Sequence, residues 1–264
     1  MPKAVVDDSL SLYYHIRGKG PPIVFIHPPV MGHKVFKHQE ELAEHYQLIF
    51  YDLPGHGQSS RGKNVLSISY LADNLRELLD ILKMGKVAVC GFSHGTLIAQ
   101  EFALKYPERT SALILCGGYP EVRTLNIKSL AAGGMVLAKL GQVPILAKIM
   151  AKTHRYFKRD EEELYKYSLK ADPQKIYEYI KAGMEYNATA YLHLLTAPVL
   201  LVYGSLEKMN HRNCKVFERE LPDSQTVYVK GATHQLPPRF FGTFNGIIRQ
   251  FLEPLADRHK ENCE

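Results

Sequence analysis

The chain has 264 residues, of which 45% are hydrophobic and 23% charged, the balance of a folded globular protein with a large core. The net charge of +6 does not indicate nucleic-acid binding, because residues 120–197 supply +4 of it along helical runs without clustered aromatic side chains. The four cysteines lack metal-binding or disulfide spacing, and no apolar run has the length of a leader or a bilayer span, so we expect a cytoplasmic protein without membrane insertion.

Short apolar runs alternate with helical patterns along most of the chain. Residues 9–22 predict a strand and turn that open a sheet as a hairpin. Later in the chain, Ser67 or Ser69 can cap a helix that begins directly after it. Strands that alternate with helices form βαβ units, so we predict an α/β fold with a mostly parallel, twisted, eight-stranded sheet flanked by helices. The expected strands are 23–27, 48–51, 86–90, 112–116, 199–203 and 226–229, and further helices are expected at 96–106, 210–221 and 239–252.

The alternation stops between residues 120 and 197, where the pattern is helical throughout. We predict that this cap segment (residues 120–197) is an all-helical cap inserted after the sixth strand, with residues 1–119 and 198–264 forming the core domain. Seven of the 16 tyrosines lie in the cap segment. We expect most of them to pack between helices, although they could also line an aromatic pocket.

Residues 91–95 read Gly-Phe-Ser-His-Gly and lie between a short apolar run and a helical run. In the pattern G-x-S-x-G, a tight strand-to-helix turn exposes the serine hydroxyl, and the two glycines let strand and helix approach closely. The sequence therefore indicates that Ser93 is a nucleophile.

The chain resembles the lid-bearing serine hydrolases of the α/β-hydrolase fold over nearly its whole length. The resemblance rests on the elbow at 91–95, on Asp-Leu-Pro-Gly-His-Gly-Gln-Ser at 52–59, and on Gly-Ala-Thr-His at 231–234. It implies that His234, which follows the last core strand, is the base that takes the Ser93 proton and returns it to a leaving group. It implies no metal ion and no organic cofactor.

The acid that orients His234 has two candidates. Members of the family usually carry an aspartate three residues after the glycine that ends the seventh strand, and this chain has Glu207 there. A glutamate can also hold the imidazole and stabilise its charged form. Some relatives place the acid after the sixth strand, which would point to Glu121.

The oxyanion site departs from the family pattern. One donor is expected to be the backbone N–H of His94, and the second normally comes two residues after the histidine of the first parallel strand. Here that position is Pro29, which has no N–H, and one missing donor typically costs about 3 kcal/mol of transition-state stabilisation. Three explanations stay open: Val30 donates instead, the side chain of His94 or His27 substitutes, or the reaction needs no complete oxyanion hole.

These observations predict a serine hydrolase of the carboxylesterase type that cleaves a small or medium carboxylic ester, lactone or related acyl compound. Ser-His-Gly at the elbow also occurs in cofactor-free dioxygenases of this fold, so base-catalysed C–C cleavage or dioxygenation of a heteroaromatic is an alternative. A slow ligand sensor on the same scaffold is a third possible function. The partner in each case is a small molecule, and the sequence does not indicate the oligomeric state.

Overall fold

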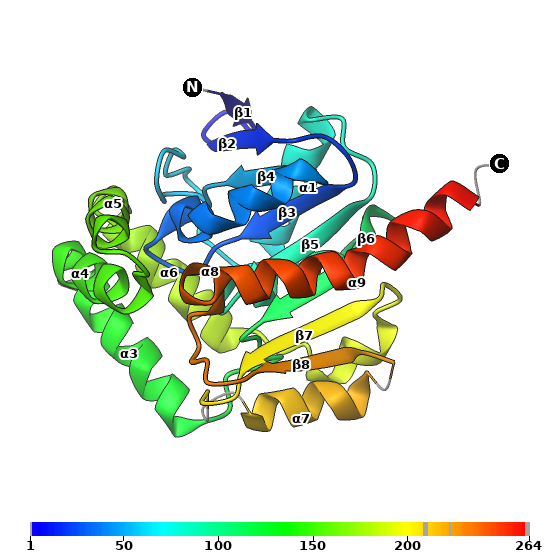
Figure 1. Cartoon of the computed structure of the whole chain (residues 1–264). Coiled ribbons are helices and arrows are strands. Elements are labelled where there is room, and N and C mark those ends of the chain that lie inside the picture. The colour runs from blue at the N-terminus through cyan, green and yellow to red at the C-terminus, as the bar shows by residue number, and fades with distance from the viewer. Residues whose placement is uncertain (1, 208–210, 222, 262–264) are drawn as a thin grey trace.

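The computed structural model describes residues 2–207, 211–221 and 223–261 and contains one eight-stranded sheet (Figure 1). The strand order is β1-β2-β4-β3-β5-β6-β7-β8. Strands β1 and β2 run antiparallel to their neighbours, and β3 to β8 are parallel, which confirms the predicted sheet. The strands are β1 (Lys3–Val5), β2 (Ser11–Arg17), β3 (Pro22–Ile26), β4 (Gln47–Tyr51), β5 (Val87–Phe92), β6 (Thr110–Cys116), β7 (Val199–Gly204) and β8 (Gln225–Val229).

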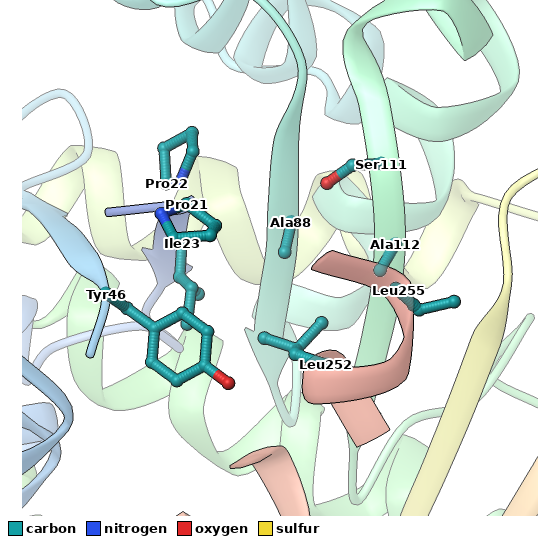
Figure 2. A pocket seen from close by; sticks show the side chains of 9 residues that line it. All are labelled: Pro21, Pro22, Ile23, Tyr46, Ala88, Ser111, Ala112, Leu252 and Leu255. Atoms are coloured by element: carbon teal, nitrogen blue, oxygen red, sulfur yellow. The ribbon is translucent and has the colours of Figure 1, made fainter. Parts of the chain in front are cut away.

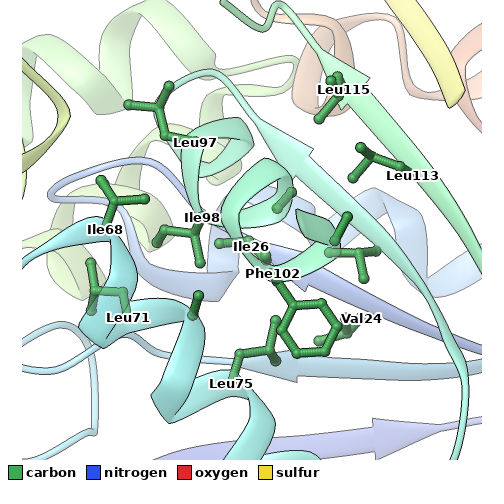
Figure 3. Close-up of a cluster of buried hydrophobic side chains, with 14 of the residues drawn as sticks. Val24, Ile26, Ile68, Leu71, Leu75, Leu97, Ile98, Phe102, Leu113 and Leu115 are labelled. Atoms are coloured by element: carbon green, nitrogen blue, oxygen red, sulfur yellow. The ribbon is translucent and has the colours of Figure 1, made fainter. Parts of the chain in front are cut away.

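Helices cover both faces of the sheet, because successive side chains of a buried strand point to opposite faces. In β3, Val24 and Ile26 belong to the core under α1 and α2 (Figure 3), whereas Ile23 and Phe25 belong to the core under α9. The first face is covered by α1 (Ile68–Ile81), α2 (Gly95–Lys105) and α7 (His211–Glu220), and the second by η1 (Gly32–Glu44), α8 (Leu236–Arg239) and α9 (Phe241–Glu261), with a short η2 (Pro107–Arg109) before β6.

Most predicted helices are present, and the structure resolves which serine caps the first of them. Ser67, not Ser69, caps α1, because its side chain accepts a hydrogen bond from the Tyr70 N–H. The helix expected at 239–252 is two helices that meet at Phe240, whose backbone is not helical. The η1 helix was not predicted, and residue 210, the expected start of α7, lies outside the described residues.

The chain between β6 and β7 is helical, apart from a single bridge between Glu121 and Asn187. Helices α3 to α6 gather on one side of the molecule, beyond the ends of the strands (Figure 1). They pack on the loop after β3 through Val30, which is buried among apolar side chains of three of them. The division into core and cap domains stays a prediction. The helices are α3 (Leu125–Lys139), α4 (Val143–His154), α5 (Lys158–Ser168), α6 (Pro173–Glu185) and η3 (Thr189–Leu194).

Candidate active site

Ser93 lies at the tip of the turn between β5 and α2 with a φ of 54°, a conformation that is strained for a residue with a side chain. Its flanking glycines are required by space. A Cβ on Gly95 would lie 2.2 Å from the Ile26 carbonyl oxygen, and one on Gly91 would lie 2.7 Å from the Thr96 Cα. The G-x-S-x-G pattern therefore lets α2 and β3 close against the turn.

Ser93, His234 and Glu207 form one chain of hydrogen bonds. The His234 Nδ1–H donates to Glu207 Oε1 over 2.5 Å, and His234 Nε2 lies 2.7 Å from Ser93 Oγ. Because the carboxylate can only accept, Nδ1 carries the ring proton and the neutral ring presents Nε2 as the acceptor of the serine proton. Glu207 is buried, whereas 27% of the His234 side chain is exposed.

Gly117, directly after β6, was not predicted as a site residue. Its φ is 59°, and a Cβ there would lie 2.6 Å from His234 Cε1 and 3.3 Å from Glu207 Oε1. Only glycine fits this position without displacing the histidine and the carboxylate that holds it. The sequence signal was a Gly-Gly pair at the end of a core strand.

Glu121, the alternative acid, is engaged elsewhere. Its Oε1 accepts from the Thr189 hydroxyl over 2.8 Å and lies 3.3 Å from Nε of Arg123, and its Oε2 accepts from the Asn187 side chain. The structure thus brings Glu207, and not Glu121, to His234.

The His94 side chain turns away from Ser93 and into the cap segment. Its Nε2–H donates to the Tyr179 carbonyl over 2.9 Å, and its Nδ1 accepts from the Tyr119 hydroxyl over 2.7 Å. Burial lowers the pKa of His94 to about 4, so the ring is neutral at pH 7. Both ring nitrogens are committed, and the hypothesis that this side chain replaces the missing oxyanion donor is wrong.

The same correction applies to the His27 side chain. Its Nδ1–H donates to the Pro28 carbonyl over 2.8 Å, and its Nε2 accepts from the Leu53 N–H over 2.9 Å. The ring is fully buried, and burial followed by the neighbouring His56 lowers its pKa to about 3. His27 therefore holds the loop after β3 against the loop after β4.

Gly183 on α6 makes room for the His94 ring. A Cβ on Gly183 would lie 2.0 Å from His94 Cε1 and 2.1 Å from Nε2. The imidazole can reach the Tyr179 carbonyl only because residue 183 has no side chain. This contact joins the residue after Ser93 directly to the cap segment, and the sequence contained no sign of it.

The loop after β3 carries the Val30 N–H, a backbone donor, beside the elbow. Ile26 pairs with Gly91 in the parallel ladder, so this loop and the turn that holds Ser93 leave the sheet side by side. Val30 has a φ of 78°, which is an outlier for a β-branched residue. Among the described residues, neither the Val30 N–H nor the His94 N–H donates to a protein group.

Asp52 fastens this loop to the cap segment. Its carboxylate accepts from His33 Nδ1 over 2.9 Å, from the Tyr167 hydroxyl over 2.6 Å and from the Gln58 N–H over 3.0 Å. Burial acts to raise the pKa of Asp52. The hydrogen bond and charge of His33, together with the hydrogen bond from Tyr167, outweigh burial and hold that pKa well below its usual range. The motif at 52–59 thus ties η1, the loop after β4 and α5 together.

His154, at the end of α4, also approaches the site and was not predicted. The Phe92 ring contacts both histidines, with centroid separations of 6.0 Å to His154 and 5.2 Å to His234. Burial, and then the charge of His234, lower the pKa of His154 to about 3. The cap segment therefore places a neutral imidazole ring near His234.

A metal site, a membrane span or a pocket elsewhere in the described residues would also bear on function. Within residues 2–207, 211–221 and 223–261, no group of three or more His, Cys, Asp or Glu side chains could hold a metal ion. In the same residues, no helix combines the length and apolarity needed to cross a bilayer. A small apolar pocket of about 40 Å³ (Figure 2) lies at the amino-terminal ends of β3, β5 and β6, at the opposite end of the strands from Ser93.

Comparison with known proteins identifies the family. A family model described as alpha/beta hydrolase fold matches residues 21–236. An uncharacterised protein of Mycobacterium tuberculosis is 31% identical over 132 residues, which are 48% of this chain but only 39% of that protein. A pimeloyl-[acyl-carrier protein] methyl ester esterase of Aeromonas salmonicida is 28% identical over 252 residues, covering 89% of this chain and 96% of the esterase. The crystal structure of an enol-lactonase from Burkholderia xenovorans has a TM-score of 0.84 at 20% identity, covering 96% of this chain and 100% of that chain. The chain belongs to the α/β-hydrolase fold family.

Proposed function

We propose that the protein is a serine hydrolase of the carboxylesterase type that cleaves a small or medium carboxylic ester, a lactone or a related acyl compound. The observation that carries this proposal is the unbroken hydrogen-bond chain from Glu207 through His234 to Ser93. The relatives named as an esterase and an enol-lactonase support the same reaction class.

In the acylation step, Ser93 Oγ attacks the carbonyl carbon while His234 Nε2 takes the hydroxyl proton. Glu207 stabilises the imidazolium that forms. The tetrahedral intermediate then collapses, the bond to the alcohol oxygen breaks, and His234 returns the proton to that oxygen. Water repeats the sequence on the acyl-enzyme, which releases the carboxylic acid and regenerates the serine.

The oxyanion needs backbone donors during both steps, and we assign them to the N–H groups of His94 and Val30. Three observations support Val30: Pro29 has no N–H, the Val30 N–H donates to no protein group among the described residues, and Val30 has a strained φ of 78° in the loop that leaves the sheet beside the elbow. We assign a function to this strain, because it presents the donor that Pro29 lacks.

The test is p-nitrophenyl ester turnover across acyl chain lengths, with Ser93→Ala as the comparison. We expect turnover that vanishes in the variant, while the urea midpoint of unfolding is unchanged. Turnover that persists in Ser93→Ala would overturn the nucleophile assignment. A native protein that turns over no ester or lactone would favour base-catalysed chemistry or a sensor instead.

A further inference from the structure

The exposed apolar side chains concentrate on two helices of the cap segment. Sixteen large hydrophobic side chains of the described residues are exposed, and half of these lie within residues 125–157. Soluble surfaces rarely gather such side chains without a partner. The eight are Leu125, Leu130, Val136, Leu140, Ile145, Ile149, Tyr156 and Phe157.

On α3 these side chains form a stripe. At 100° per residue, Leu125, Val136 and Leu140 fall within about 60° of one another, and they are 80%, 55% and 66% exposed. The buried residues of α3, Ile127 and Ala138, lie on the opposite side. The stripe is therefore a solvent-facing surface and not part of the core.

The stripe continues onto α4 across the turn between the helices. Leu140 directly follows α3, and Ile145 and Ile149 lie one turn apart on the exposed side of α4. Figure 1 shows both helices at the outer edge of the molecule, away from the sheet. We call the exposed side of these helices the α3–α4 surface.

The charge of the same segment has one sign. Residues 122–159 contain eight Lys or Arg and no Asp or Glu, so this segment carries +8, whereas the whole chain carries +6 and the remainder therefore −2. Lys128, Lys148 and Lys152 are exposed beside the apolar side chains. Arg123 and Arg155 pair with Glu121 and Glu161, and the exposed lysines leave the apolar surface with a positive charge.

We propose that the α3–α4 surface docks on an anionic lipid bilayer. Exposed aliphatic side chains with lysines at their edges match an interface where acyl chains lie beneath negatively charged headgroups, and lysine stems reach from one layer to the other. A second copy of this chain fits poorly, because a two-fold contact would set one cationic surface against another. Nucleic acid would account for the lysines but not for the exposed leucines and isoleucines.

This docking is peripheral and does not depend on the proposed hydrolase reaction, so both are testable separately. The assay is co-sedimentation of the full chain with phosphatidylcholine vesicles that contain 30% phosphatidylglycerol, against vesicles of phosphatidylcholine alone. The Ser93→Ala variant should bind as the native protein does. We expect binding to the anionic vesicles only, weakened by added salt.

Two sets of variants test the two components. Reversing three lysines should lower the partition coefficient at least a hundredfold, since each cation near an anionic surface contributes about fivefold. Replacing three apolar side chains should lower it at least tenfold. Matched controls alter exposed side chains elsewhere and should bind normally. The charge set is Lys128→Glu, Lys148→Glu and Lys152→Glu, and its control is Lys19→Glu, Lys63→Glu and Lys86→Glu. The apolar set is Val136→Ser, Leu140→Ser and Ile145→Ser, and its control is Val65→Ser and Ile81→Ser.

A circular dichroism spectrum and a urea midpoint close to native establish that each variant is folded. Failure of the native protein to bind anionic vesicles overturns the proposal, as does equal binding to both vesicle types. Loss of binding in the control sets to the same degree overturns it too. If the native chain forms dimers that the apolar set abolishes, and binds no vesicles, the surface is a self-association interface and the lipid assignment is wrong.

Discussion

The contact between His94 and Gly183 predicts a large effect from the replacement Gly183→Ala. The new Cβ would lie 2.0 Å from the His94 ring, whereas an ordinary contact needs about 3.5 Å, so the ring must move by about 1.5 Å. Its hydrogen bonds to Tyr119 and Tyr179 measure 2.7 and 2.9 Å and would both break. Each buried group left unpaired lowers the free energy of unfolding by about 1–3 kcal/mol. The higher helix propensity of alanine raises it by about 1 kcal/mol.

We therefore expect Gly183→Ala to lower the free energy of unfolding by about 3 kcal/mol, measured by urea denaturation. It should also lower kcat at least tenfold, because the displaced residue carries the proposed oxyanion N–H. The matched control is Gly133→Ala on α3, where a Cβ meets nothing within 4 Å. That variant should be slightly more stable than the native protein, with unchanged kinetics.

A double-mutant cycle isolates the contact. The variant His94→Ala removes the ring, so adding Gly183→Ala to it should cost little further, because the remaining close contact, 2.8 Å to Leu97 Cδ1, is with the end of a flexible side chain. The two changes should be non-additive by at least 1 kcal/mol. If Gly183→Ala behaves like Gly133→Ala in both stability and kcat, then the contact between His94 and Gly183 does not hold the elbow in place.

Three further predictions follow from the site. Glu207→Gln should lower kcat about ten-thousandfold and Glu121→Gln less than tenfold, and the reverse order in ester turnover would move the acid to Glu121. Pro29→Gly should change kcat by less than about threefold, because Val30 already donates; a hundredfold rise would show that the second donor was missing. Acid should destabilise the fold, because three buried histidines have pKa values lowered to about 3 or 4, against 6.5 in the unfolded chain. The unfolded state therefore binds more protons below pH 6.5, and the free energy of unfolding falls as the pH drops toward 4. These histidines are His27, His94 and His154, and each lowers the free energy of unfolding by up to about 2 kcal/mol at pH 5. Equal urea midpoints at pH 7.5 and pH 5 would contradict this prediction.

The parallel sheet was predictable because its strands are short apolar runs bounded by turn residues, as in Ile23 to Ile26. Ser93 was predictable from the G-x-S-x-G pattern, whereas the resemblance to the family implied His234 and left Glu207 and Glu121 as candidate acids. All three residues of the triad follow the ends of core strands, where a parallel sheet brings its loops together. The η1 helix was missed, since a 3-10 helix lacks the 3.6-residue period that identifies an α-helix.

Other parts of the site depend on contacts between residues far apart in the chain. Gly183 has a role only because His94 fills its space, and no spacing rule relates two residues that are separated by most of the cap segment. His154 approaches His234 through the same tertiary packing. The sequence also left His94 and His27 open as side-chain donors, because it cannot show that their ring nitrogens are already bonded.

The most direct test of the central claim is labelling with a fluorophosphonate, read by intact mass and peptide mapping. We expect one phosphonyl group per chain, attached to Ser93, absent in Ser93→Ala and formed far more slowly in His234→Ala. A native protein that stays unlabelled, or one that is labelled equally fast without His234, would contradict an activated serine at this site.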